Sequence, residues 1–190
     1  MKKDVIFLNG PPRSGKDTLA EKIVALLPNS VKHVKFANEV KVGTHLKWNV
    51  PLLEPNSYEN VKDIPLEIFG GMSPREAYIQ YSEEEMKPKY GNDIFGKKLY
   101  EEIDRSKETI FVVSDSGFEE EALPIMENFD CTLVKIIRSG TSFEKDSRSY
   151  WVNKYYPDVI NVTNNGREID LGYSAVMILK KVLDNFIKSC

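Results

Sequence analysis

Apolar and polar positions follow one another along the chain in blocks that predict short buried strands separated by helices. Residues 5–8 form an apolar run typical of a buried strand, and residues 31–36 alternate as a second strand does. After Gly15, apolar residues recur at helical spacing until Pro28 closes the stretch. The stripe that we expect to face the core consists of Leu19, Ile23, Leu26 and Leu27.

The second half of the chain repeats this alternation. Apolar runs predict strands at residues 110–114, 132–137 and 159–162. The helices predicted there lie around residues 95–103, 119–128 and 171–188, the last with Ala175, Leu179, Val182 and Phe186 facing inward. Strands that alternate with helices indicate an α/β fold in which a parallel sheet is covered on both faces.

The middle of the chain is harder to interpret. Residues 38–72 are polar, contain several prolines and show no clear period. Directly after them, Ser73 is a capping residue, Pro74 suits a first helical turn, and Glu76 completes a capping box. We expect this helix to end at Pro88, because an interior proline removes a helical hydrogen bond.

Composition and charge narrow the class of protein. The chain has 190 residues, of which 41% are apolar, enough to bury one core. Its net charge of -3 argues against broad electrostatic binding to nucleic acid. Two cysteines cannot build a disulfide scaffold, and the apolar runs are too short for a membrane span or a secretory segment. We therefore expect a soluble cytoplasmic protein with no nucleic-acid or membrane partner.

Residues 10–18, with the sequence GPPRSGKDT, follow the first predicted strand and open the first predicted helix. This is the context of a P-loop, whose main-chain N–H groups hold phosphate oxygens at a helix N-terminus. Gly10 and Gly15 permit a backbone that a Cβ would obstruct. Lys16 would reach the β- and γ-phosphates, and Arg13 could lie over them. The alternative is a chance glycine turn, which the flanking strand and helix disfavour.

Two acidic residues are candidates for the neighbourhood of a metal ion. Asp17 fills the position that Ser or Thr normally has in a P-loop, so either its carboxylate serves Mg²⁺ or Thr18 takes that role. Asp17 equally suits a structural role as an acidic first-turn residue. Asp115 follows an apolar strand, at the edge where open α/β sheets bind ligands. It could hold Mg²⁺ through water or position the nucleotide.

Further short motifs follow the P-loop in order along nearly the whole chain. They are FANEVK at 36–41, SPR at 73–75 with Gln80, DSGF at 115–118 with Glu121, DSRS at 146–149, and NNG at 164–166 with Leu171. Together with the P-loop ending GKDT, they resemble the phage-type deoxynucleoside monophosphate kinases, within the nucleoside monophosphate kinase group. Three residues depart from the motifs of that family. Asn38 replaces an acid, Gly117 an arginine and Arg148 a histidine.

The resemblance implies a three-layer P-loop kinase fold, in which a five-stranded parallel sheet has helices on both faces. It implies one domain over residues 1–190, with a core at 1–37 and 107–190, an acceptor-binding helical insertion at 38–106 and a lid at about 139–156. The implied reaction moves the γ-phosphoryl of ATP to a (deoxy)nucleoside monophosphate with Mg²⁺. The location would be the host cytoplasm if the chain is phage-encoded, and a homodimer is left open.

The same resemblance assigns catalytic roles to three arginines, alongside Lys16 and Asp115. Arg75 would clamp the acceptor phosphate, its alternative being a solvated surface position. Arg138 would stack on adenine or contact phosphate, and Arg148 would join the clamp on the transition state. The polar stretch between these two suits a lid that excludes water, or else an ordinary surface loop.

Two sets of binding residues complete the prediction. The donor set is Gly10, Arg13, Ser14, Gly15, Lys16, Asp17, Thr18, Arg138, Asn165 and Gly166. The acceptor set is Phe36, Lys41, Lys62, Arg75, Tyr78 and Gln80. Aromatic residues in this part of the chain, including Trp48 and Tyr81, either stack on a base or belong to the core. Trp151, Tyr155 and Tyr156 are interpreted as hinge or packing residues. His33 and His45 lack partners at metal-ligand spacing, so no zinc site is expected.

Two rival functions keep the P-loop. One is a kinase for another small phosphorylated or hydroxylated metabolite, and the other is a nucleotide-binding regulatory module. A transferase needs a second cavity lined by Arg75, whereas a regulator would expose apolar surface within residues 38–105. ATP is favoured over GTP as donor, because no Asn-Lys-x-Asp segment follows Thr132.

Overall fold

The computed structural model describes residues 3–144, 146–152 and 158–188. Tyr155, Tyr156 and the side chain of Phe186 lie outside the described part. Within it, no helix has both the length and the hydropathy that a bilayer crossing requires.

The centre of the fold is a five-stranded parallel sheet with the order β2-β3-β1-β4-β5. Its strands are β1 Asp4–Asn9, β2 Val31–Val34, β3 Ile110–Val113, β4 Asp130–Ile137 and β5 Asp158–Thr163. Strand β1 lies in the middle, and its Val5 is in register with Phe111 and Cys131. Every residue of β1 and β3 is buried, because helices cover both faces. The predicted α/β class and five-stranded sheet are confirmed.

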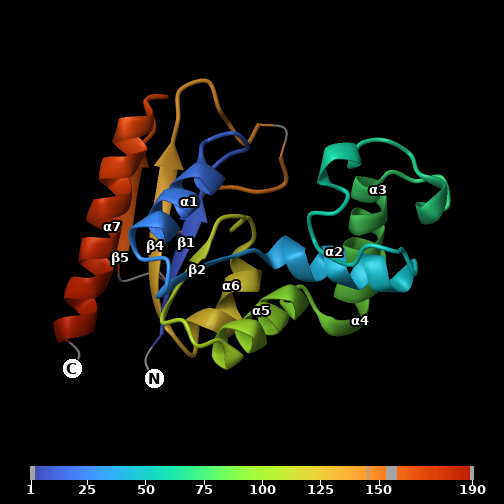
Figure 1. The fold of residues 1–190 in the computed structure, drawn as a ribbon, viewed down its shortest axis with the longest axis horizontal. Coiled ribbons are helices and arrows are strands. Elements are labelled where there is room, and N and C mark those ends of the chain that lie inside the picture. Colours follow the sequence, from blue (N-terminus) through green and yellow to red (C-terminus); the bar gives the residue numbers. More distant parts are fainter. Residues whose placement is uncertain (1–2, 145, 153–157, 189–190) are drawn as a thin grey trace.

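Two pairs of helices form the outer layers (Figure 1). Helices α1 Lys16–Leu26 and α7 Glu168–Lys188 cover one face, with Leu19, Ile23, Ala175 and Leu179 in the core. Helices α5 Ile94–Arg105 and α6 Glu119–Met126 cover the other, where Leu99 and Ile125 are buried. The prediction for Leu26 was wrong. Leu26 is 44% exposed, and the buried residues of α1 are Leu19, Ala20 and Ile23.

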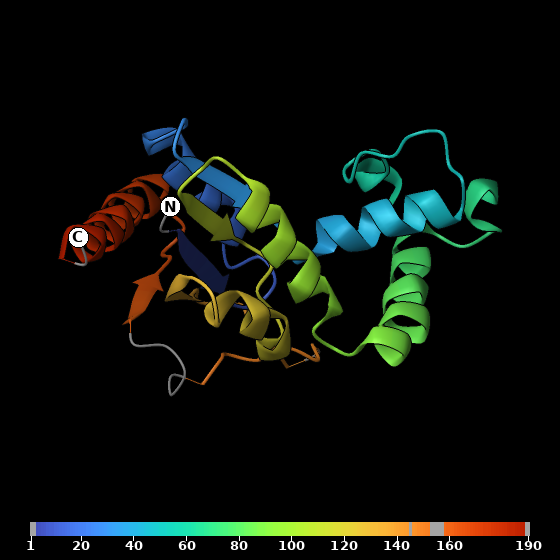
Figure 2. The ribbon, with the colours of Figure 1, turned by 90° about the horizontal axis from the view of Figure 1, so that it is seen from below.

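A helical insertion projects from one end of this core (Figures 1 and 2). It contains α2 Phe36–Lys47, the 3₁₀ turns η1 Glu59–Val61 and η2 Glu67–Phe69, α3 Pro74–Ile79, the π-helix η3 Gln80–Met86 and α4 Lys87–Tyr90. It has a small core of its own, built on Val50, Tyr58, Phe69 and Ala77. The following helix, α5, packs against the sheet through Leu99 and Ile103, although it falls inside the range 38–106.

Two local predictions in this region fail for identifiable reasons. The strand expected to reach Phe36 ends at Val34, and Phe36 begins α2. The helix that starts at Ser73 does have the predicted capping box with Glu76, but it does not end at Pro88. The π-helix widens the preceding turns, so the chain continues helically through Pro88 to Tyr90. A π turn bonds five residues back, which relieves the clash that a proline makes with the carbonyl four residues back.

Candidate functional site

The loop between β1 and α1 has the shape of a phosphate cradle. Gly15 is the N-cap of α1 and has φ 100°, in the left-handed region that favours glycine. A Cβ on Gly15 would lie 2.5 Å from Asn164 Nδ2, and a Cβ on Gly10 would lie 2.7 Å from the Ile136 carbonyl oxygen. Both glycines are therefore needed for close packing of the loop against the ends of β4 and β5.

Two side chains inside this loop fit an anionic ligand. Lys16 Nζ donates to the carbonyl oxygens of Gly10 at 2.7 Å and Pro11 at 2.9 Å, so the ammonium lies across the loop. Burial, and then the positive charge of Arg148, lower the pKa of Lys16 to about 8. The Ser14 hydroxyl is fully buried and has no hydrogen-bond partner among the described residues. Buried hydroxyls are normally paired, so Ser14 is suited to a ligand oxygen.

Asp17 belongs to a polar network at the end of the sheet. Its carboxylate accepts from the buried Ser114 hydroxyl at 2.6 Å and forms an ion pair with Lys35 at 2.7 Å. Ser114 Oγ also lies 2.7 Å from His33 Nε2. Although burial opposes ionisation, the hydrogen bonds from Lys35 and Ser114 hold the pKa of Asp17 below its usual value. The neighbouring Thr18 is exposed on α1.

Asp115 is tied to the start of α2. Its two carboxylate oxygens accept from the backbone N–H groups of Phe36 at 3.1 Å and Ala37 at 2.9 Å. It therefore supplies the cap that the local N-cap residue, Lys35, does not provide. Burial raises the pKa of Asp115 and outweighs these hydrogen bonds. Asp115 thus fixes the start of the insertion relative to the end of β3.

A second group of predicted donor residues meets at the other side of the loop. Arg138 Nη1 donates to the Arg13 carbonyl oxygen at 3.0 Å, and a Cβ on Gly166 would lie 4.0 Å from Arg138 Nη2. Asn165 is exposed, whereas the buried Asn164 donates from Nδ2 to the Ser14 carbonyl oxygen at 2.8 Å. Asn164 is therefore the contact that the prediction missed, one residue away from the asparagine it selected.

A cavity of about 720 Å³ lies between the insertion and the core. Its lining consists of Arg75, Ile79, Glu83, Lys87 and Asn92 from the insertion side and Phe118, Glu120, Asp146, Ser147 and Arg148 from the core side. Lys87 Nζ lies 4.8 Å from the centre of the Phe118 ring and 2.7 Å from Glu83 Oε1. The structure thus brings Arg75 and Arg148, which are distant in sequence, to one cavity. Lys87 and Phe118 were not selected from the sequence.

The remaining predicted acceptor residues do not line this cavity. Arg75 itself forms an exposed ion pair with Asp63 at 2.6 Å. Lys41 and Lys62 both pair with Glu59 on the insertion. Gln80 is half-buried at the start of η3.

The aromatic residues of the insertion pack mainly against one another. The Tyr78 hydroxyl lies 2.9 Å from Nε2 of the buried His45, and burial raises the pKa of Tyr78 to about 12. Trp48 packs edge-on against Phe69, with ring centres 6.3 Å apart. Phe36 is only 3% exposed and stacks on Phe7 in the main core. These contacts account for Phe36 and Tyr78 as packing residues.

The base of the predicted lid is fixed by Asn9 at the end of β1. Its Nδ2 donates to the carbonyl oxygens of Ser116 at 2.9 Å and Ser149 at 3.2 Å, while its Oδ1 accepts from the Trp151 N–H at 3.1 Å. Trp151 is buried against Phe7, so it packs in the core, in line with its predicted role. The sequence analysis did not select Asn9, although its position directly after the apolar run of residues 5–8 is a signal that could have identified it.

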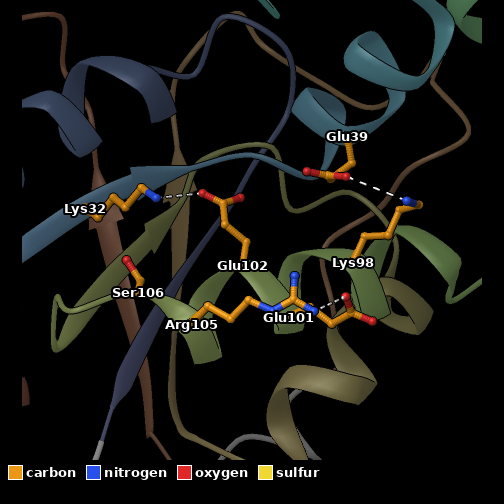
Figure 3. Close-up of a pocket in the computed structure, with 7 residues that line it drawn as sticks. All are labelled: Lys32, Glu39, Lys98, Glu101, Glu102, Arg105 and Ser106. Atoms are coloured by element: carbon orange, nitrogen blue, oxygen red, sulfur yellow. Dashed lines mark hydrogen bonds and ion pairs between the residues drawn. The ribbon is translucent and has the colours of Figure 1, made fainter. Parts of the chain in front are cut away.

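A second hollow of about 520 Å³ lies over α5, away from the P-loop (Figure 3). Figure 3 shows Lys32, Lys98 and Arg105 directed toward Glu102, Glu39 and Glu101, respectively. Each charge in these pairs is matched within the hollow, so nothing there selects a charged ligand. Among the described residues, no group of three His, Cys, Asp or Glu side chains could hold a metal ion.

Comparison with known proteins supports the fold alone. No protein-family model and no curated protein matches the chain. Solved structures do match. A candidate kinase from Chloroflexus aurantiacus J-10-fl is 12% identical over 96% of this chain and 97% of that one, with a TM-score of 0.52. A gluconokinase from Sinorhizobium meliloti 1021 is 10% identical over 99% and 97%, with a TM-score of 0.48. A shikimate kinase from Acinetobacter baumannii is 15% identical over 97% and 95%, with a TM-score of 0.49.

The sheet order, the helices on both faces and the loop after β1 define the fold of the P-loop kinases. At these identities the likeness does not select an acceptor.

Proposed function

We propose that this protein is an ATP-dependent phosphotransferase whose acceptor is a small anionic molecule, with a (deoxy)nucleoside monophosphate as the first candidate. The observation that carries the proposal is a cavity lined by both Arg75 and Arg148, whose neighbour Ser149 is bonded to Asn9 directly before the P-loop. Arg148 is close enough for its charge to act on Lys16. A phosphate donor in the loop and an acceptor in the cavity would therefore meet across these cations.

In such a transfer the protein contributes mainly by placing positive charges around the donor and acceptor groups. An oxygen of the acceptor forms a bond to the γ-phosphorus as the bond to the β–γ bridging oxygen breaks, and ADP leaves with that electron pair. Lys16 would neutralise charge on the donor side. The guanidinium of Arg148 would do so from the acceptor side, while Arg75 would hold the far anionic group of the acceptor.

The residues present fit a triphosphate and its metal ion. The unpaired Ser14 hydroxyl and the narrow turn at Gly10 and Gly15 suit phosphate oxygens. Asp17, with the Ser114 hydroxyl beside it, would hold Mg²⁺ directly or through water in exchange for Lys35. When bound, Mg²⁺ offsets charge on the phosphates and orients them.

Two observations keep other functions in view. Glu121 is buried and directly follows Glu120, which lines the cavity, and burial raises the pKa of Glu121 to about 7. A carboxyl of this kind suits a hydroxyl acceptor, which must lose a proton, and so favours a kinase for another metabolite. The insertion also exposes apolar side chains that a regulatory module would use. They are Leu46, Leu52, Leu53, Ile64, Ile68 and Ile79.

A coupled ADP-release assay separates these functions. The whole chain is incubated with MgATP and with each nucleoside or deoxynucleoside monophosphate in turn, then with hydroxylated and phosphorylated sugars and hydroxy acids. We expect ADP release to depend on one anionic acceptor. Selective stimulation by an uncharged alcohol would favour the hydroxyl-acceptor kinase. ADP release that no acceptor changes would favour a nucleotide-hydrolysing or binding module and would refute the proposal.

A further inference from the structure

Arg148 is held in one orientation by its neighbour two residues back. Its backbone N–H and its Nε donate to Asp146 Oδ1 at 3.0 Å and 2.7 Å, and its Nη2 pairs with Asp146 Oδ2. The side chains are only 31% and 14% exposed, respectively. A guanidinium carries five N–H donors, so this pairing fixes one edge, and the other donors have no hydrogen-bond partner among the described residues. Both residues line the cavity.

Gly117 provides the space in which Arg148 lies. A Cβ on Gly117 would be 2.3 Å from Arg148 Cδ and 2.9 Å from Cγ, far inside normal contact distance. Gly117 is buried and does not have a positive φ, so its backbone conformation does not require glycine. The arginine stem therefore lies directly on the Gly117 backbone, and any larger residue there would displace it.

Asn9, the last residue before the P-loop, places this guanidinium beside the phosphate cradle. Its Nδ2 donates to the carbonyl oxygens of Ser116 at 2.9 Å and Ser149 at 3.2 Å, which adjoin Gly117 and Arg148 in sequence. Arg148 is therefore held next to the loop while its side chain lines the cavity on the other side. Without Asp146 and the space at Gly117, a long flexible side chain would sample many rotamers instead of this one.

We propose that Gly117 and Asp146 are positioning residues, which preset Arg148 between the phosphate cradle and the acceptor cavity so that its free N–H groups meet the phosphoryl group in transfer. This inference rests on the proposed function. Neither Gly117 nor Asp146 belongs to the predicted binding sets. Both would affect catalysis only through the position of Arg148.

The kinetic test is a double-mutant cycle with G117A and R148A in the full chain. G117A should lower kcat by about 100-fold, the scale on which a misplaced catalytic group costs activity, and should leave the KM for ATP little changed. In the R148A background, adding G117A should cause no further loss, because Gly117 acts through Arg148. Independent, multiplying losses, or full activity of G117A, would overturn the inference.

A matched control and a second variant guard against misfolding. Gly172 on α7 also lacks a positive φ, and a Cβ there would meet nothing within 4 Å, so G172A adds the same carbon without contact and should keep wild-type kinetics. If G117A fails to fold by circular dichroism, D146N takes its place in the cycle. D146N should lower kcat and lose that effect when Arg148 is absent, and a loss that persists without Arg148 would refute the role of Asp146.

A readout that needs no turnover separates this inference from the proposed function. Nitrogen-15 NMR of the arginine Nε–H groups, with the Arg148 signal assigned by its loss in R148A, should show an Nε–H that Asp146 protects from solvent exchange in the wild type. Exchange should become faster in D146N and G117A and stay slow in G172A. Slow exchange that persists in G117A would show that Gly117 does not hold Arg148, and fast exchange in the wild type would show that Asp146 does not hold it. If the wild type has no kinase activity yet this protection depends on Gly117 and Asp146, only the proposed function fails.

Discussion

Replacing the buried Glu121 with glutamine should stabilise the protein at neutral and higher pH. Glu121 is 8% exposed at the first turn of α6, and burial raises the pKa of its carboxyl from 4.5 to about 7 despite the attraction of Lys87. Between these pH values the unfolded chain releases a proton that the folded protein retains. Stability is therefore full below pH 4.5 and falls as the pH rises to about 7.

The size of the effect follows from the shift. Each pKa unit corresponds to about 1.4 kcal/mol, so ionisation of Glu121 costs the folded state about 3 kcal/mol once the pH exceeds 7. The neutral amide of E121Q avoids this cost. For a domain of this length, about 3 kcal/mol corresponds to a rise in Tm of about 6–12 °C.

The assay is chemical denaturation of wild type and E121Q from pH 4.5 to pH 8.5. We expect nearly equal free energies of unfolding at pH 4.5 and a gap that widens to about 3 kcal/mol by pH 8. E120Q, at the exposed neighbouring position, is the matched control and should show no such gap. A difference between E121Q and wild type that is constant across this pH range, or that has the opposite sign, would refute the reasoning.

Three further variants test the site. K16A should lower the rate of phosphoryl transfer by about 1,000-fold, because it removes a preorganised cation from the phosphates, and should leave the circular dichroism spectrum unchanged. Unchanged turnover would contradict the P-loop assignment. R75A should raise the KM for the acceptor by about tenfold while MgATP affinity, titrated separately by calorimetry, stays constant; an equal loss of ATP affinity would exclude a role confined to the acceptor. D115A should lower the free energy of unfolding by about 1 kcal/mol, because the start of α2 loses its cap, and unchanged stability would exclude that contact.

Local patterns along the chain predicted most of the core. The strands at residues 110–114 and 132–137 and the helix built on Phe95, Leu99 and Ile103 were found because their apolar spacing reports burial directly. Helix α2 was missed because its start depends on Asp115, which is 78 residues away from Ala37 in sequence. A cap supplied from another element leaves no local signal.

One part of the candidate site could be predicted from the sequence, and the other part could not. The P-loop is one continuous segment, so its glycines and Lys16 were identified by spacing alone. The cavity combines residues from α3, α4 and the two loops after β3 and β4, and only the folded chain shows that Lys87 and Phe118 join Arg75 there. Gly117 illustrates the limit most clearly. A glycine is needed there to leave room for the side chain of Arg148, which lies 31 positions later in the sequence.

Single-turnover transfer from ATP labelled at the γ-phosphorus tests the central claim most directly. The enzyme, in excess over labelled MgATP, is mixed with the acceptor identified by ADP release, and the products are separated by chromatography. The label should appear in the phosphorylated acceptor, with little in inorganic phosphate, and should remain in ATP with K16A. Label that passes only to inorganic phosphate with every acceptor would contradict a transferase with two facing sites.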